Sequence, residues 1–195
     1  MNPELFERIY QKHAKVLHNT GAKNRQLLIC FSGVPGSGKT FNAKLLESQF
    51  RGIRISSSEI NDVLGELKYP PDNKLRRETI HEYTKQLLGK LSGLKNGLLI
   101  LDSSIDRKYK LVFDWAKANL WPVFVISMEF SKEDILARIK ARAPQSYAEY
   151  SRHLGYWLED QLDFLSRHEA DFVINADLEE LPEDLVKIIS KKLNP

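Results

Sequence analysis

The feature of this sequence that most constrains its fold is a glycine-rich loop that directly follows an unbroken apolar run. The run covers residues 27–31 and has the composition of a parallel strand that is buried on both faces. The loop consists of Gly33, Val34, Pro35, Gly36, Ser37, Gly38, Lys39 and Thr40. A helical pattern follows at residues 41–50. This order of strand, glycine loop and helix is typical of a P-loop and predicts a nucleotide-binding α/β domain.

The residue types of the loop match the chemistry of a bound triphosphate. The glycines allow several backbone N–H groups to converge on phosphate oxygens without interference from side chains. Lys39 can reach the β- and γ-phosphates, Thr40 can bind Mg²⁺, and the N-terminus of the following helix adds partial positive charge. We therefore predict that residues 33–40 bind the phosphates of ATP or GTP together with magnesium.

Shorter apolar runs alternate with helical patterns along the rest of the chain. The apolar runs cover residues 52–55, 98–101, 123–127 and 172–174, and the helical patterns cover 73–94, 108–118, 132–142, 147–168 and 183–193. Such alternation implies parallel strands joined by right-handed crossovers. The predicted fold is α/β, a three-layer P-loop NTPase fold with a parallel five-stranded sheet, as in nucleotide kinases.

Helix-capping residues support several of these assignments. Ser131 precedes Asp134 by three residues, and Ser146 precedes Glu149 by the same interval, which is the spacing of a capping box. Asp72 stands just before the long pattern at 73–94. These residues predict where three of the helices begin.

The N-terminal segment predicts one further helix, in front of the nucleotide motif. Asn2 can cap it, Pro3 suits its first turn, and apolar residues recur at helical spacing. We expect a helical extension over residues 1–20 that packs on the outside of the sheet, with an arm that binds a protein partner as the alternative. Residues 1–195 are expected to form a single domain.

The composition limits where such a chain can work. Charged residues interrupt the N-terminal segment, so it lacks the apolar core of a secretory signal, and no stretch approaches the length of a membrane span. The single cysteine, Cys30, excludes an intrachain disulfide. A cytoplasmic protein without membrane contact is the expectation. The net charge of +3 leaves a nucleic-acid partner open.

An acidic residue at the end of a neighbouring strand is the second part expected of a nucleotide site. The apolar run at 98–101 ends in Asp102, which can hold the magnesium ion or its waters. Capping of the next turn, together with Ser103 and Ser104, is the alternative role. The P-loop favours the metal role.

The third expected part is positive charge over the phosphoryl group that is transferred. Arg138 and Arg142 are four residues apart and therefore lie on one helix face, directly before the break at residues 143–145. Residues 143–150 are thus predicted to form a short lid that brings these arginines to the site. Two solvated surface arginines are the competing interpretation.

With these parts placed, the chain resembles the small P-loop kinases grouped around polynucleotide 5′-kinase and the zeta-type toxins. The resemblance extends over residues 27–193 and rests on residues 33–40, 55–60 and 101–104, on Arg107, on 121–123, and on Arg138 with Arg142. It implies an ATP- and Mg²⁺-dependent kinase that transfers the γ-phosphoryl group to a hydroxyl of a small molecule, a nucleotide or a nucleic-acid end. Lys39, Asp102, Arg138 and Arg142 would be its catalytic residues.

The resemblance also suggests contacts to the nucleotide base. In this family adenine commonly packs near the loop after the last strand, which makes Asn175 the implied base contact. ATP is preferred to GTP partly because the sequence contains no Asn-Lys-x-Asp element with the spacing of a regulatory GTPase. Trp115, Trp121 and Trp157 are expected to pack in the core, with base stacking as the alternative.

The acceptor half of the motif departs from the family pattern. Where the family often has an aspartate that takes the hydroxyl proton and an arginine that orients the acceptor, this chain has Ser58 and Asn61. Glu59, Asp62 or Asp102 would then be the base, or transfer would proceed by positioning and charge stabilisation. The departure keeps two alternatives open: a nucleotide-binding switch protein and an NTP hydrolase.

Basic residues supply two further candidates for the acceptor side. The resemblance makes Arg107 a ligand of the acceptor or of a phosphate, with a surface charge at a helix start as the alternative. Lys74, Arg76 and Arg77 begin the long helical pattern, in the region where such kinases hold their acceptor. A solvated helix face is the simpler interpretation of this charge run.

Overall fold

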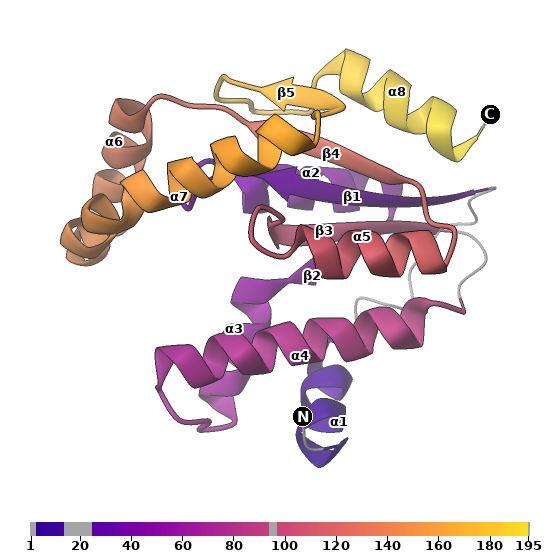
Figure 1. The fold of residues 1–195 in the computed structure, drawn as a ribbon, viewed down its shortest axis with the longest axis horizontal. Helices are drawn as coiled ribbons and strands as arrows, with labels where there is room; N and C mark the ends of the chain where they lie inside the picture. The colour runs from indigo at the N-terminus through magenta and orange to yellow at the C-terminus, as the bar shows by residue number, and fades with distance from the viewer. Residues whose placement is uncertain (1–2, 14–24, 94–96, 195) are drawn as a thin grey trace.

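A computed structural model describes residues 3–13, 25–93 and 97–194 of the chain. Its centre is a sheet of five parallel strands in the order β2-β3-β1-β4-β5 (Figure 1). The strands are β1 (Gln26–Ser32), β2 (Ile53–Ser56), β3 (Gly97–Ser104), β4 (Val123–Met128) and β5 (Phe172–Ile174). The predicted parallel five-stranded sheet is therefore confirmed, and each predicted apolar run lies within or overlaps one strand.

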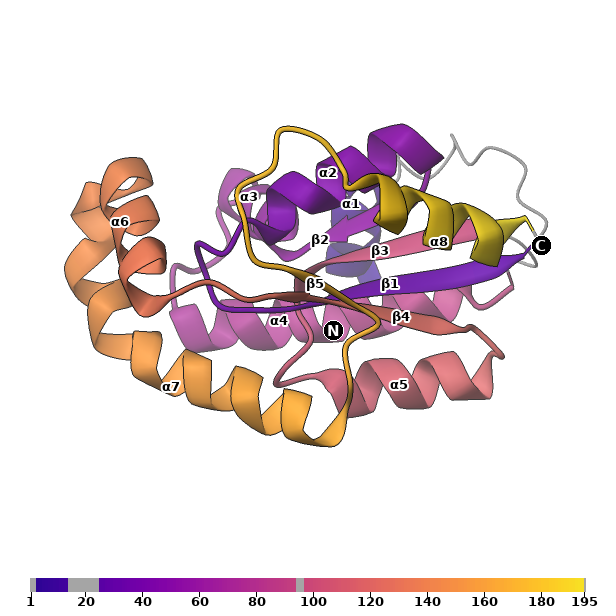
Figure 2. The ribbon, with the colours of Figure 1, turned by 90° about the horizontal axis from the view of Figure 1, so that it is seen from above.

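Helices cover both faces of this sheet. They are α1 (Pro3–His13), α2 (Lys39–Phe50), α3 (Ser57–Glu66), α4 (Asn73–Leu91), α5 (Tyr109–Ala118), α6 (Lys132–Arg142), α7 (Tyr147–Arg167) and α8 (Glu183–Leu193). Figure 2 shows α2 and α8 on one side of the sheet and α4, α5 and α7 on the other, which gives the three predicted layers. No helix in the described part of the chain combines the length and the apolarity needed to cross a membrane.

The alternation of side chains along the strands divides the core into two clusters. Leu28 and Cys30 of β1 belong to the cluster that includes side chains of α4 and α5. Leu27, Ile29 and Phe31 belong to the cluster under α2 and α8. Because successive strand residues point to opposite faces, an unbroken apolar run can fill both clusters at once.

Helix α3 was not among the helices predicted from sequence. It begins directly after β2, and the Ser56 hydroxyl accepts a hydrogen bond of 3.4 Å from the Glu59 N–H at its first turn. Only Ile60 and Leu64 of this helix are buried. Two apolar positions among serine, asparagine and acidic residues give a weak periodic signal, which explains why the pattern was missed.

Two of the three predicted caps are confirmed. The Ser131 hydroxyl accepts from the Asp134 N–H at 3.1 Å, and Asp72 Oδ1 accepts from the Leu75 N–H at 2.6 Å. The predicted cap at Ser146 is wrong, because its side chain makes no capping hydrogen bond. Ser146 ends a 3₁₀ turn, Pro144–Ser146, and already has helical backbone angles, so the chain enters α7 without the extended residue that a cap requires.

Helix α1 packs on other helices. Phe6 and Ile9 are buried, and the Phe6 ring lies 5.1 Å from that of Tyr83 on α4. Figure 1 places α1 below α4, and Phe6 and Ile9 belong to the core cluster that also includes Ile53 and Ile55 of β2. Residues 1–2 and 14–20 of the predicted extension, including the expected cap Asn2, lie outside the described residues.

Candidate active site

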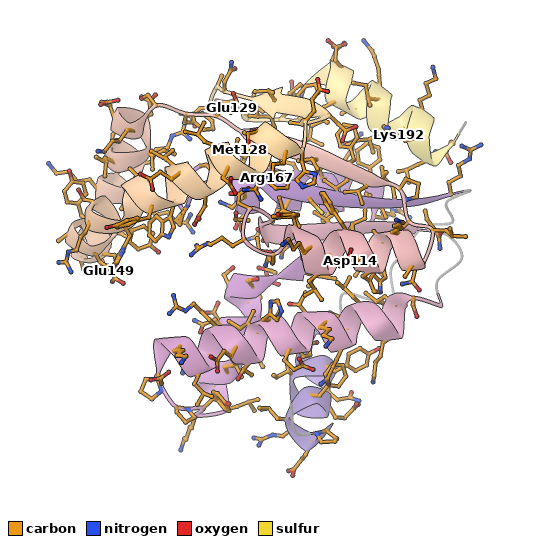
Figure 3. All side chains as sticks on the ribbon, viewed as in Figure 1. Asp114, Met128, Glu129, Glu149, Arg167 and Lys192 are labelled. Atoms are coloured by element: carbon orange, nitrogen blue, oxygen red, sulfur yellow. The ribbon has the colours of Figure 1, made fainter. Side chains whose placement is uncertain are left out.

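The P-loop connects β1 to α2 and has a backbone that requires glycine. Gly33, Gly36 and Gly38 have φ values of 148°, 87° and 96°, which side-chain-bearing residues rarely adopt. A Cβ atom on Gly33 would also lie 2.9 Å from Met128 Cβ at the end of β4 (Figure 3) and 2.9 Å from Ser37 Oγ. The glycines therefore allow both the turn and the close approach of the loop to β4.

Lys39 stabilises the curved loop through hydrogen bonds to its backbone carbonyl groups. Its Nζ donates to the Gly33 carbonyl at 2.8 Å and to the Val34 carbonyl at 2.7 Å. Burial lowers the pKa of Lys39 to about 8, although the carboxylates of Asp106 and Asp102 oppose this shift. The ammonium group is thus placed among backbone dipoles and loses its proton more readily than an exposed lysine does.

The two predicted magnesium ligands lie together. Thr40 Oγ1 donates a hydrogen bond of 2.9 Å to Asp102 Oδ1, although 62 positions separate the two residues in the sequence. Among the described residues there is no group of three or more His, Cys, Asp or Glu side chains that could hold a metal ion. One hydroxyl and one carboxylate suit Mg²⁺ that arrives with a nucleotide, since magnesium in such sites keeps waters and phosphate oxygens as its other ligands.

A buried arginine, which sequence reasoning missed, fixes the other side of Asp102. Arg54 Nη1 donates to Asp102 Oδ2 at 2.7 Å, its Nε donates to Glu47 at 2.7 Å, and its Nη2 pairs with Glu59. Burial lowers the pKa of Arg54, but the hydrogen bonds and charges of Glu47 and Glu59 outweigh this effect and raise it. The available signal was a charged residue in the middle of the strand Ile53–Ser56, where its neighbours are apolar.

A cavity of about 590 Å³ opens in front of the P-loop. It lies where the strands end, which is the usual ligand site of a parallel α/β sheet. Its lining comprises Gly33, Val34, Pro35, Gly36, Gly38, Lys39, Thr40, Phe41, Ser57, Ser58, Arg77, Ser104, Asp106, Arg107, Arg142, Tyr150, Trp157 and Asp160. The cavity thus extends from the loop to α4 on one side and to α7 on the other.

Asp106 is the second site residue that sequence reasoning missed. It follows β3, is only 6% exposed, and accepts hydrogen bonds at Oδ2 from the Gly33 N–H at 3.2 Å and from Ser104 Oγ at 2.6 Å. Its other oxygen, Oδ1, is buried without a hydrogen-bond partner among the described residues. A second acidic residue four positions after Asp102 was the signal that could have found it.

The two predicted lid arginines point to different places. Arg142 lines the large cavity. Arg138 pairs with Asp177 at 2.8 Å, and its guanidinium carbon lies 3.7 Å from the centre of the Phe130 ring. The structure therefore brings one of the pair to the P-loop cavity and places the other beside the loop that follows β5.

The segment that carries these arginines packs on the P-loop itself. Val34 lies in a small core with Ile135, Ile139 and Leu154, so α6 and α7 contact the loop through apolar side chains. Figure 1 shows α6 and the first half of α7 extending past the end of the sheet, and Figure 3 marks the two ends of α7 by Glu149 and Arg167. The predicted lid at residues 143–150 is the turn of this hairpin and the first turn of α7.

A second, smaller cavity of about 260 Å³ also borders the P-loop. Its lining comprises Ser37, Gly38, Phe41, Asn42, Met128, Phe130, Ala176, Asp177 and Leu178. The predicted base contact Asn175 is exposed and stands next to this lining rather than in it. Trp115 and Trp121 pack in the core as expected, whereas Trp157 packs against Tyr150 and also lines the large cavity.

The predicted candidates for a base are occupied or distant. Glu59 pairs with Arg54, and Asp102 is hydrogen-bonded through both oxygens. Asp62 is exposed and is not part of the cavity lining. At the two positions that depart from the family pattern, Ser58 Oγ lies 3.0 Å from Ser56 Oγ, and Asn61 Oδ1 accepts from Arg76 Nη1 at 3.2 Å.

The basic residues of the acceptor side are divided as well. Arg77 and Arg107 line the cavity, and Arg107 Nε lies 3.2 Å from Asp160 Oδ2 on α7. Lys74 and Arg76 are not part of the lining, and Arg76 instead binds backbone carbonyls of the turn before α4. Of the predicted cluster, only Arg77 therefore reaches the site.

Comparison with solved structures places the fold. A protein of the PezAT chromosomal toxin–antitoxin system of Streptococcus pneumoniae matches with a TM-score of 0.66 and 15% identity, over 91% of this chain and 78% of that one. Shikimate kinase from Bacteroides thetaiotaomicron matches with a TM-score of 0.55 and 16% identity, over 86% and 98%. The APS kinase of Mycobacterium tuberculosis, solved with AMPPNP and APS, matches with a TM-score of 0.53 and 15% identity, over 85% and 96%.

The chain has a P-loop kinase fold. No protein-family model matches it, and no curated protein matches it by sequence. At these identities the structural likeness concerns the fold alone, and the function depends on the residues of the site.

Proposed function

We propose that this protein is an ATP- and Mg²⁺-dependent kinase that transfers the γ-phosphoryl group to a hydroxyl acceptor. The observation that carries the proposal is the continuity of the cavity. Lys39 and Thr40 line one end of it, and the space continues past the loop to Arg77 on α4 and Trp157 on α7. A volume of about 590 Å³ is within the usual range for a small-molecule site, and it leaves room for an acceptor beside the phosphates.

The donor half follows from the residues at the loop. The amides of residues 33–40 and Lys39 would hold the β- and γ-phosphates, and the smaller cavity beside Phe130 would receive the base. Magnesium, bound by Thr40 with Asp102, would neutralise charge that develops during transfer. The match of the fold to shikimate kinase and APS kinase supports this assignment.

The acceptor half follows from the positive charge of the cavity wall. Arg77, Arg107 and Arg142 come from three separate parts of the fold and line the same cavity. Guanidinium groups suit phosphate and carboxylate groups because their donors match the geometry of these anions. An acceptor that carries such a group, whether a small molecule, a nucleotide or a nucleic-acid end, would fit this wall.

Labelled ATP tests the proposal directly. The protein is incubated with [γ-³²P]ATP, Mg²⁺ and a panel that contains shikimate, APS, nucleosides, nucleoside monophosphates and a 5′-hydroxyl oligonucleotide. We expect label on one class of acceptor, lost on addition of EDTA and in Lys39→Met. Lys191→Met, an exposed lysine near the end of α8, is the matched control and should retain transfer. ATP binding without transfer to any class would contradict the proposal.

A nucleotide switch protein or NTP hydrolase is the second candidate, and Ser58 favours it. This residue lines the cavity at the position where the family resemblance places an aspartate, and a serine is no base near neutral pH. A hydrolase would release phosphate steadily with no acceptor present. A switch protein would bind ATP without turnover, and Ser58→Asp would create or strongly raise transfer.

A further inference from the structure

The two carboxylate oxygens of Asp106 differ in their hydrogen bonding. Oδ2 accepts from the Gly33 N–H and from the Ser104 hydroxyl, which fixes the side chain against the start of the P-loop. Oδ1 is buried and has no donor within hydrogen-bond distance among the described residues. A buried polar atom without a partner destabilises a fold, which points to a functional reason for this carboxylate in the cavity lining.

Asp106 also stands next to the group that handles the phosphates. It lines the same cavity as Lys39, and its charge is the largest of those that oppose the lowering of the Lys39 pKa. Lys39 and Asp106 therefore border the same space, in which an acceptor hydroxyl would meet the phosphates. Position, rather than acidity alone, sets Asp106 apart from the other acids of the site.

The other carboxylates near the site are already engaged. Arg54 binds both Glu59 and Asp102. Asp160, the only other carboxylate in the described lining of the cavity, is paired with Arg107 at the open rim, with its side chain 39% exposed. Among the described residues, Asp106 is thus the one buried cavity carboxylate that no cation binds directly.

We propose that Asp106 is the catalytic base of phosphoryl transfer, replacing the carboxylate that is missing at Ser58. The inference rests on the proposed function. The Asp106 carboxylate takes the proton of the acceptor hydroxyl while the acceptor oxygen forms a bond to the γ-phosphorus. The bond from the γ-phosphorus to the β–γ bridging oxygen breaks, and its electron pair leaves with ADP. The protonated Asp106 then returns its proton to water.

This assignment moves the base from one strand end to another. The family resemblance places it after β2, at the front of α3, whereas Asp106 belongs to the connection between β3 and α5. Both connections line the same cavity, the first through Ser57 and Ser58 and the second through Asp106. A base on either connection therefore borders the space that an acceptor would occupy.

Asp106→Asn isolates the base function from the structural one. The amide oxygen of asparagine can keep the two hydrogen bonds that Oδ2 accepts, while an NH₂ group, which cannot take a proton, replaces the other oxygen. Asp114→Asn, at an exposed position on α5 (Figure 3), is the matched control. The measurements are transfer of label from [γ-³²P]ATP to the acceptor class found with the wild type, transfer to water, ATP affinity by calorimetry and thermal unfolding.

We expect the turnover number of Asp106→Asn to fall about 10²- to 10⁴-fold, the usual contribution of a general base. ATP affinity and the unfolding temperature should match those of the wild type, and Asp114→Asn should retain full turnover. Adding Ser58→Asp to Asp106→Asn should restore part of the rate, because it returns a carboxylate to the same cavity. A purely structural role for Asp106 predicts instead that the rate falls together with ATP affinity or stability.

The outcomes that would contradict the base assignment can be distinguished from the one that would contradict the proposed function. If the wild type transfers phosphate and Asp106→Asn does so within about threefold, the base assignment is wrong and the proposed function stands. If the variant loses ATP affinity or folding stability in proportion to its rate, Asp106 only supports the loop and the assignment is again wrong. If the wild type transfers phosphate neither to an acceptor nor to water, the proposed function fails and the assignment fails with it.

Discussion

Arg54 Nη1 and Asp102 Oδ2 are joined by a buried hydrogen bond of 2.7 Å that ties β2 to β3 beside the P-loop. The two residues belong to neighbouring strands but do not lie opposite each other: Arg54 is opposite Ile100, and Asp102 is opposite Ser56. With Oδ2 held by Arg54, Oδ1 is left to meet the Thr40 hydroxyl. The orientation of the predicted magnesium ligand thus depends on a residue that belongs to another strand.

Removal of Arg54 should destabilise the fold strongly. We expect Arg54→Met to lower the free energy of unfolding by about 3–5 kcal/mol, because a buried Asp102 carboxylate is left without its counter-charge. Denaturant unfolding monitored by circular dichroism measures the change. Arg167→Met is the matched control: this exposed residue pairs with Asp163 one helical turn away, and its loss should leave the stability nearly unchanged.

A second substitution distinguishes lost charge pairing from lost packing. Asp102→Asn added to Arg54→Met removes the uncompensated charge, so the double variant should be more stable than Arg54→Met alone. An Arg54→Met variant with the stability of the wild type would show that the ion pair contributes little.

The order of strands and helices could be predicted well because most elements have a local periodic pattern of apolar residues. Every strand of the sheet and the helices α2 and α4 to α8 follow apolar patterns that can be recognised in windows of the sequence. Helix α3 could not be recognised in this way, since its stability comes from Ile60 and Leu64 packing into a core that the rest of the fold provides. Tertiary packing, rather than propensity, determines that segment.

The same distinction applies to the residues of the site: some are found from local sequence, and others depend on long-range contacts. Lys39 and Thr40 belong to a contiguous motif, and Asp102 ends an apolar run, so local sequence finds all three. Arg54 acts through a contact with Asp102 across 48 positions, and Asp106 through a contact with Gly33 across 73 positions. Such contacts form only after the sheet has brought the strand ends together, so no local sequence pattern predicts them.

Lys39 should take up a proton when ATP binds near pH 8. Burial lowers its pKa in the folded protein from 10.5 to about 8, so at pH 8 about half of the molecules have a neutral Lys39. Phosphate charges favour the ammonium form, and binding should therefore take up about half a proton at this pH. Calorimetric titrations of ATP and Mg²⁺ in two buffers of different ionisation enthalpy give this number.

Lys39→Arg is the control, because a guanidinium stays protonated at this pH and should remove the Lys39 contribution. The sign for stability follows from the same shift. Between pH 8 and 10.5 the unfolded chain binds more protons at Lys39 than the folded chain, so this residue's contribution to stability rises with pH. Equal proton uptake by wild type and Lys39→Arg would contradict the assignment.

Two glycine substitutions should change stability in opposite directions. Gly33→Ala places a Cβ atom 2.9 Å from Met128 Cβ at a φ of 148°, and we expect it to cost about 1–3 kcal/mol and to weaken ATP binding. Gly155 lies inside α7, where a Cβ would meet nothing within 4 Å. Gly155→Ala should stabilise the protein by about 0.5–1 kcal/mol without changing ATP affinity. Denaturant unfolding and ATP titration of both variants check the pair, and a Gly33→Ala protein with wild-type stability and affinity would contradict the proposed role of the loop.

Arg142 and Arg138, which share a helix, should have separate kinetic roles. Arg142 lines the cavity that holds Lys39, so Arg142→Ala should lower the turnover number about 10³-fold or more, as expected for an arginine that stabilises charge in transfer, with little change in KM for ATP. Arg138 stacks on Phe130 and pairs with Asp177 at the smaller cavity, so Arg138→Ala should chiefly raise KM for ATP.

Steady-state rates at varied ATP concentration separate the two effects, and Arg152→Ala at an exposed position on α7 controls for loss of charge. The assignment would be wrong if Arg138→Ala lowered the turnover number as much as Arg142→Ala, because both arginines would then act on the phosphoryl group and the hairpin would have to rearrange during catalysis.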